Sequence, residues 1–166
     1  MHWWRVLGIG LLATACWAQD GPDSVQPQAK RFSKRVVIAG LAGPWELTWG
    51  PDRMLWITER MGKRIVRVHP DTGEKSVAVT IPEVSAPGGQ DGLMGMALHP
   101  DLLRGTGNDF VYAAYTYQDR SKPADLRVDD PASPYRYLYG KIVRFRYDSA
   151  RQQLVEPRDL ITEIGR

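Results

Sequence analysis

Short apolar stretches, each only a few residues long, alternate with polar turn sequences along most of this chain. β-branched and aromatic residues are frequent in these stretches, which is typical of β-strands, and no window keeps a helical period. The pattern predicts strands at residues 36–39, 45–49, 54–58, 65–68, 76–81, 93–98, 110–117, 141–147 and 160–164. The chain is therefore expected to be all-β.

Turn residues separate these stretches at the places where hairpins require them. The segment Arg60-Met61-Gly62-Lys63 lies between two predicted strands and contains a glycine, as a tight hairpin does. Pro70-Asp71-Thr72-Gly73 is a turn by composition, because proline fixes φ and glycine accepts positive φ. Neighbouring strands are therefore expected to pair in an antiparallel manner.

The order of strands and turns occurs twice along the chain. Pro51-Asp52, an apolar stretch at 54–58 and the segment 62–68 form one unit, and Pro100-Asp101, 110–115 and 140–145 repeat its order. A repeated unit made only of short strands and turns predicts a blade of a β-propeller. Because two blades do not close a ring, we expect residues 35–166 to be an incomplete N-terminal part of a larger propeller.

The second unit differs from the first by a long polar insertion at residues 118–137. A loop of this length is either functional or disordered, and the sequence leaves both interpretations open. Tyr135, Tyr137 and Tyr139 could line a sugar site, since an aromatic face packs against the apolar face of a sugar ring. The spacing by two places them on one side only if that segment is extended.

The N-terminus has the pattern of an export signal. Arg5 provides a positive charge, an apolar stretch at 6–15 is too short to span a bilayer, and Ala18 permits cleavage before Gln19. We therefore predict a signal peptide at 1–18, a flexible leader at 19–34, and a periplasmic or secreted protein. In the alternative interpretation, residues 13–16 form a lipoprotein box, and Cys16 carries a lipid that anchors the protein to a membrane.

Composition and charge exclude several classes of function. The net charge is +3, and the basic residues are mixed with acidic ones, which argues against nucleic-acid binding. The single cysteine excludes an internal disulfide and a thiolate metal cluster, and no pair of histidines is spaced for zinc. No metal ligands are predicted within this chain.

The segment from Gly88 to Asp101 is the most informative one for chemistry. Its glycines allow sharp turns and a close approach to a ligand, and Gln90 and Asp91 present polar atoms just before a predicted strand. It is neither a phosphate-binding loop, since the Gly-Lys-Ser/Thr ending is missing, nor a dinucleotide fingerprint, since the surroundings are all-β. Gln90 and Asp91 are thus the candidate binding residues.

Several motifs, taken in order, resemble the soluble quinoprotein glucose dehydrogenases and aldose sugar dehydrogenases, the glucose/sorbosone dehydrogenase family. The resemblance covers roughly residues 35–164. The motifs are Trp49-Gly50-Pro51-Asp52, Trp56-Ile57-Thr58-Glu59-Arg60, Gly62-Lys63-Arg64-Ile65, Gly89-Gln90-Asp91-Gly92-Leu93, Leu98-His99-Pro100-Asp101, Lys141-Ile142-Val143-Arg144 and Pro157-Arg158-Asp159-Leu160-Ile161.

The resemblance implies a six-bladed propeller that binds pyrroloquinoline quinone (PQQ), usually with calcium, and oxidises the anomeric hydroxyl of an aldose to a lactone. In the family a histidine takes the hydroxyl proton while hydride passes to the quinone, and the reduced quinone passes electrons to an external acceptor. Gln90 matches the glutamine beside the substrate, and Asp91 departs from the usual Asn or Gly. The catalytic histidine and the quinone and calcium ligands are expected beyond Arg166, so no catalytic residue is assigned here.

His99 is not expected to be the catalytic base, because its His-Pro-Asp sequence forms a turn in this family, and His69 lies in the equivalent turn of the first unit. The sequence thus predicts part of an exported PQQ-dependent aldose dehydrogenase that is inactive as this chain alone. The alternative is a non-catalytic propeller module that completes its ring with a partner chain.

Overall fold

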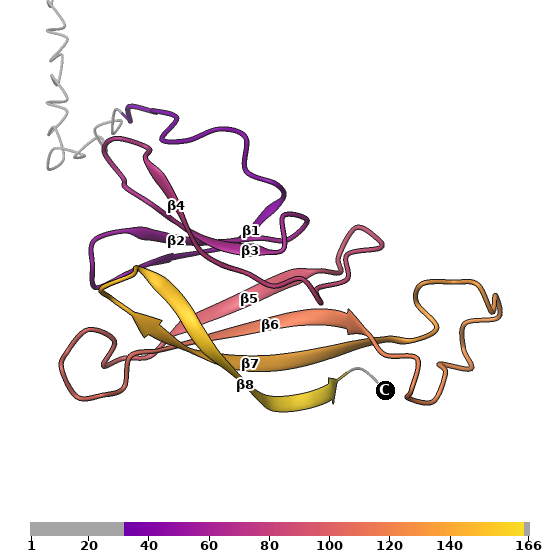
Figure 1. Ribbon diagram of the computed structural model, residues 1–166. Helices are drawn as coiled ribbons and strands as arrows, with labels where there is room; N and C mark the ends of the chain where they lie inside the picture. The colour runs from indigo at the N-terminus through magenta and orange to yellow at the C-terminus, as the bar shows by residue number, and fades with distance from the viewer. Residues whose placement is uncertain (1–31, 165–166) are drawn as a thin grey trace, which may run out of the picture. The chain divides into compact units, whose positions relative to one another are not determined.

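Eight β-strands form the whole of the regular structure in this computed structural model, which describes residues 32–164 (Figure 1). Residues 35–164 belong to one compact unit. The predicted signal peptide at 1–18, with Cys16, lies outside the described residues, as does most of the leader at 19–34. Within the described part, no helix has the length and apolar character needed to span a membrane.

The strands form two separate four-stranded antiparallel sheets, each built in chain order. This confirms the prediction of an all-β chain with two repeated units. The first sheet contains β1 (Pro44–Trp49), β2 (Leu55–Glu59), β3 (Arg64–Val68) and β4 (Lys75–Thr80). The second contains β5 (Leu93–Leu98), β6 (Phe110–Gln118), β7 (Leu138–Asp148) and β8 (Gln153–Ile164).

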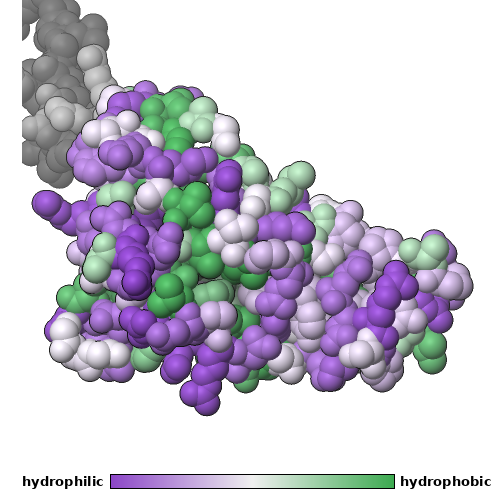
Figure 2. All heavy atoms as spheres, viewed as in Figure 1, coloured by the Kyte–Doolittle hydropathy of each residue, from purple (hydrophilic) through white to green (hydrophobic). Residues whose placement is uncertain are grey.

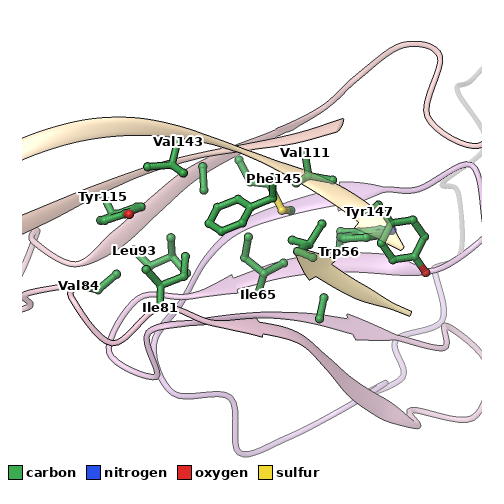
Figure 3. Packing of buried hydrophobic residues seen from close by; sticks show 14 of the residues in the cluster. Trp56, Ile65, Ile81, Val84, Leu93, Val111, Tyr115, Val143, Phe145 and Tyr147 are labelled. Carbon is green, nitrogen blue, oxygen red and sulfur yellow. The ribbon is translucent and has the colours of Figure 1, made fainter. Parts of the chain in front are cut away.

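The two sheets share one apolar core. In β6 and β7 every second side chain is buried, and these side chains face the first sheet. Figure 3 shows Trp56 and Ile65 of the first sheet packed against Phe145 and Tyr147 of the second. Burying such large side chains between two sheets removes much apolar surface from water, which is the main force that holds one sheet on the other.

A polar cluster at one end of this core also joins the sheets. Arg67 is almost fully buried and donates two hydrogen bonds to Asp52, 2.6 and 2.9 Å long, and one of 3.2 Å to Gln152. Its guanidinium lies 5.3 Å from the Trp56 ring and 5.4 Å from the Tyr147 ring. One side chain of β3 therefore contacts both sheets.

Residues 36–39 do not form a strand, so this prediction was wrong. No neighbouring strand pairs with them, and Val37 and Ile38 instead pack on Ile57 and its neighbours at the open face of the first sheet. Arg35 fixes the start of this segment by donating to the carbonyls of Pro70 and Asp71 at 3.0 and 2.9 Å. The β-branched side chains of this segment contribute to packing, because its backbone does not pair with a strand of the sheet.

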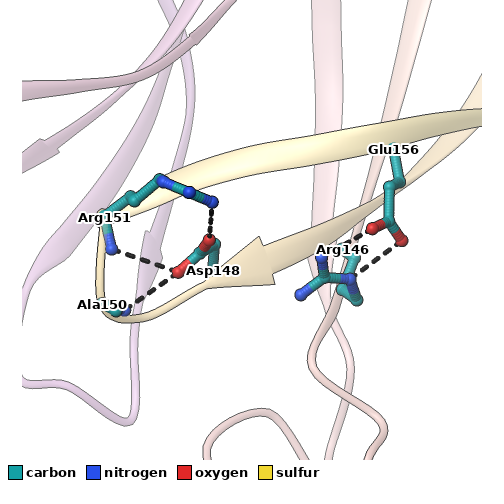
Figure 4. Close-up of polar contacts among 5 residues, drawn as sticks. All are labelled: Arg146, Asp148, Ala150, Arg151 and Glu156. Atoms are coloured by element: carbon teal, nitrogen blue, oxygen red, sulfur yellow. Dashed lines mark hydrogen bonds and ion pairs between the residues drawn. The ribbon is translucent and has the colours of Figure 1, made fainter.

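The last strand is longer than predicted. β8 begins at Gln153, and its pairing with β7 is interrupted by register shifts, one of them near Glu156, which has a φ of +53°. Pro157 cannot donate a hydrogen bond, so it is tolerated only because β8 is an edge strand with a bulge. Figure 4 shows the exposed pair Arg146–Glu156 bridging β7 and β8 beside this bulge.

Candidate functional site

Gln90 and Asp91 lie in the connection between the two sheets, just before β5 begins. Gln90 is exposed to solvent and Asp91 is half-buried. The same end of the sheets carries the β2–β3 hairpin and the insertion between β6 and β7. These two segments and the Gln90 connection follow β2, β6 and β4, and these three strands run in the same direction within their antiparallel sheets. The structure thus gathers three loops around the predicted binding residues.

Arg60, in the β2–β3 hairpin, holds the loop that contains Gln90. Its guanidinium Nη1 donates to the carbonyl oxygens of Gly88 at 2.7 Å and Asp91 at 2.8 Å. The main chain of Arg60 is also fixed, since its N–H donates to Gly43 and its carbonyl accepts from Leu93. Sequence reasoning missed this residue, because 28 positions separate it from Gly88 and no local pattern reports the contact.

The base of the loop is fixed by Thr116 of β6. The Gly92 N–H donates to the Thr116 hydroxyl at 2.7 Å, and that hydroxyl donates to the Ser85 carbonyl at 2.6 Å. Gly92 has a φ of +120°, and a Cβ there would lie 2.7 Å from the Arg60 carbonyl oxygen. Only glycine fits this position, which explains the glycine directly after Asp91.

The insertion at 118–137 is tied to its own base and reaches the Gln90 loop. The Gln118 side chain donates to the Pro134 carbonyl at 3.1 Å, and the Asp119 N–H donates to the Tyr137 carbonyl at 3.0 Å. A Cβ on Gly88 would lie 2.0 Å from the Tyr135 hydroxyl, so Tyr135 lies directly against the loop. The insertion is largely covered by polar side chains (Figure 2).

The three tyrosines of this region do not form one row. Tyr135 and Tyr137 lie in turns, and only Tyr139 lies in a strand, where it is buried against Tyr117 and donates to the Pro123 carbonyl. The segment is not extended, so the condition for a shared aromatic face is not met. Tyr135, which is 41% exposed, is the one of the three that borders the Gln90 loop.

Both turn histidines act as caps of turns. His99 Nδ1 accepts from the Asp101 N–H at 3.1 Å, and His69 Nδ1 accepts from the N–H groups of Asp71 and Thr72. His99 follows β5 whereas Gln90 precedes it, so the length of the strand separates the two. His99 is therefore in a turn, as the sequence predicted, and at the other end of the sheet from Gln90.

A buried lysine that was not predicted lies between the sheets. Lys141 Nζ is 2.9 Å from Glu83 and 3.3 Å from Asp159, and it lies 4.8 Å from the Tyr117 ring. The Tyr115 hydroxyl donates to Glu83 at 2.5 Å. The alternation of β7 could have revealed Lys141, because it occupies a position where the neighbours two residues away are buried.

This cluster is structural rather than catalytic. Burial would lower the pKa of Lys141, but its hydrogen bonds and charge interactions with Glu83 and Asp159 outweigh burial and raise the pKa. Burial also raises the pKa of the Tyr115 hydroxyl far above its ordinary value, and Glu83 raises it further. Both groups therefore stay protonated at neutral pH, and neither is available as a nucleophile or base.

The contacts of the described residues identify no ligand of the quinone or the calcium implied by the resemblance. The quinone carries several carboxylates and needs cationic partners. Three cations of this region are already engaged, since Arg60 binds backbone carbonyls, Lys141 binds two carboxylates, and Lys122 pairs with Glu163 at 2.7 Å. Residues 32–164 also contain no group of three or more His, Cys, Asp or Glu side chains that could hold a metal. We therefore assign no step involving the quinone to a residue of this chain.

Comparison with known proteins gives a consistent result. The family model for glucose/sorbosone dehydrogenase matches residues 41–155. Quinoprotein glucose dehydrogenase B of Acinetobacter calcoaceticus is 35% identical over 115 residues, which cover 69% of this chain and 23% of that protein.

Solved structures agree in fold. The PQQ-bound aldose sugar dehydrogenase of Streptomyces coelicolor matches with a TM-score of 0.57 and 32% identity, over 77% of this chain and 32% of that one. The apo-form of the soluble aldose sugar dehydrogenase of Escherichia coli matches at 19% identity with a TM-score of 0.56, over 75% of this chain and 30% of that one. The chain thus spans 23% to 32% of the length of these relatives.

Proposed function

Because this chain belongs to the glucose/sorbosone dehydrogenase family, we propose that it supplies two blades to a PQQ-dependent aldose dehydrogenase that oxidises the anomeric hydroxyl to a lactone. Its two sheets are a partial β-propeller, as predicted, within an expected ring of six blades. The observation that carries the proposal is the family match over residues 41–155, which includes the whole Gln90 loop. Calcium and an external electron acceptor complete the proposed system.

The part proposed for this chain is recognition of the sugar. The Gln90 amide can both donate to and accept from sugar hydroxyl groups, and its exposure leaves it accessible to a ligand. Asp91 has only acceptor oxygens when ionised, so it would favour a sugar hydroxyl that donates. Export is part of the proposal because of the signal-like residues 1–18, with lipid attachment at Cys16 as the alternative.

A chimera tests the role of Gln90. In quinoprotein glucose dehydrogenase B of A. calcoaceticus, the matching segment is replaced by residues 41–155, and glucose oxidation is measured with PQQ, calcium and a dye acceptor. Gln90→Ala is expected to raise KM about tenfold, because one hydrogen-bonding partner of the sugar is lost. The 166-residue chain alone, under the same conditions, is expected to give no turnover.

The matched control is Gln153→Ala, which removes an exposed glutamine at the far end of β8 and is expected to leave KM unchanged. A folded, PQQ-loaded chimera that does not oxidise any aldose would contradict the proposal. Equal KM values for the Gln90 and Gln153 variants would show that Gln90 does not bind the sugar.

A second candidate function is a non-catalytic module that completes its ring with a partner chain. The observation that favours it is the open face of the first sheet, where Trp45, Leu47 and Trp49 of β1 are about half exposed. Apolar strands that face solvent in this way invite association with another sheet. A folded complex of defined stoichiometry without sugar oxidation would support this alternative.

A further inference from the structure

The backbone of the loop at residues 88–91 is held by hydrogen bonds from one side chain, that of Arg60. Across residues 32–164, the hydrogen bonds to the backbone of this loop are the two from Arg60 Nη1, to Gly88 and to Asp91. Gly92, the next residue, is held separately by Thr116. The tip of the loop, Gly89 and Gln90, is exposed.

The geometry of these bonds closes the loop. One guanidinium nitrogen has two N–H groups, and each donates to the carbonyl at one end of the loop. Bonds from a charged donor are stronger than neutral ones, and Arg60 is only partly exposed, so water competes less well for these carbonyls. The two carbonyls are thereby brought together, and the chain between them must turn outward.

Arg60 itself is well anchored. Its N–H donates to the Gly43 carbonyl at 2.8 Å, and its carbonyl accepts from the Leu93 N–H at 3.3 Å. The backbone that carries the Arg60 side chain is therefore fixed relative to both the hairpin and the start of β5. The two hydrogen bonds from Arg60 Nη1 then link the loop to this backbone.

We propose that Arg60 is a positioning residue for substrate recognition, which holds Gln90 outward at the end of the sheets where the sugar binds. This inference rests on the proposed function of Gln90. Both N–H groups on Arg60 Nη1 are used by the loop, so these two donors serve the loop and not the ligand. In this inference, the effect of Arg60 on the reaction is exerted through the position of Gln90.

The first test measures the loop in the full chain without any cofactor. Backbone order parameters of Gly89 and Gln90, from NMR relaxation, are expected near 0.8 in the wild type and below about 0.6 in Arg60→Ala. Arg60→Lys, which keeps the charge but lacks the planar pair of donors, is expected to give intermediate values. Arg104→Ala, which removes an exposed arginine at the other end of β5, is the control and should leave the loop ordered.

The second test is a double-mutant cycle in the chimera described above. Arg60→Ala is expected to raise KM for glucose about as much as Gln90→Ala, and the double variant should be no worse than Gln90→Ala alone. Arg60→Lys should recover part of the loss, which a variant that merely fails to fold would not show.

The possible failures are distinguishable. An ordered loop in Arg60→Ala, or effects of Arg60→Ala and Gln90→Ala that add fully, would overturn this inference while leaving the sugar role of Gln90 intact. An unchanged KM in Gln90→Ala would instead overturn the proposed function of Gln90, and with it this inference.

Discussion

At the scale of single residues, buried charges determine how this protein responds to pH. Glu59 is fully buried and pairs with Arg64 and with Lys75 at 3.5 Å. Burial would raise its pKa, but the Arg64 hydrogen bond, the Ala42 N–H and the two positive charges outweigh burial and hold the pKa below 4.5. The carboxylate is therefore the form that the fold stabilises.

Glu59→Gln is expected to lower the free energy of unfolding at pH 7 by about 1–2 kcal/mol, because a charged hydrogen bond is lost. In the wild type, a lowered folded-state pKa adds stability that is complete above pH 4.5 and is lost as pH falls through the folded value. The difference between the proteins should thus shrink in acid. Urea unfolding at pH 7 and at pH 3.5 measures it.

A suitable control for this experiment is Glu156→Gln, which breaks an exposed ion pair with Arg146 and should cost less at pH 7. A Glu59→Gln variant whose deficit stays constant with pH would show that the carboxylate is not the source of the stability.

At the scale of strands and sheets, Arg67 adds a polar contact between the two blades to the apolar core that they share. Its donors contact Asp52 and Gln152, and its planar group stacks beside Trp56 and Tyr147. Lysine can provide the charge but neither the paired donors nor the flat stacking surface.

Arg67→Lys is therefore expected to lower the free energy of unfolding by about 2–3 kcal/mol, measured by chemical denaturation. Arg146→Lys provides the same substitution at an exposed pair (Figure 4) and is expected to leave stability nearly unchanged. Equal losses of unfolding free energy in the two variants would mean that burial does not make Arg67 more important for stability than the exposed Arg146.

Much of the strand pattern could be predicted because alternation and turn residues are local signals. β5 was predicted at its observed bounds. β8 was predicted too short, because Pro157 argues against a strand unless that strand is a bulged edge strand, as β8 is. Residues 36–39 have strand composition but no partner, and pairing is a property of the whole fold.

The candidate site was only partly predictable for the same reason. Gln90 and Asp91 were found from a local motif, and they do lie in a loop before β5. Arg60 could not be found, because its role depends on a hydrogen bond between a hairpin and a distant loop. Tyr135 was one of three candidates, and its contact with Gly88 in the folded protein separates it from the other two.

At the scale of the whole molecule, the exposed apolar face of β1 is expected to cause association. Trp45 and Leu47 line a groove of about 350 Å³ together with Leu41 and Ile57, and the half-exposed Trp49 follows them along β1. Apolar patches of this kind on a sheet edge favour contact between molecules. The full chain is therefore expected to self-associate as its concentration rises.

Leu47→Lys is expected to weaken this association, because it introduces a charge at the centre of the face, and sedimentation velocity over a range of concentrations measures the change. Leu126→Lys is the matched control, since Leu126 is 80% exposed but lies in the insertion, away from β1. Wild-type protein that stays monomeric at every concentration, or a stronger effect from Leu126, would contradict the prediction.

The buried hydroxyl of Thr58 forms a hydrogen-bonded link between successive blades. It accepts from the Glu46 N–H at 2.9 Å and donates to the Met94 carbonyl at 2.8 Å, so it joins β1 and β2 to the inner strand of the next sheet. No β-ladder links β1 to β5, although the two lie side by side. The hydroxyl therefore bridges neighbouring blades at their inner edge, and valine, which has the same shape but no hydroxyl, would remove this bridge.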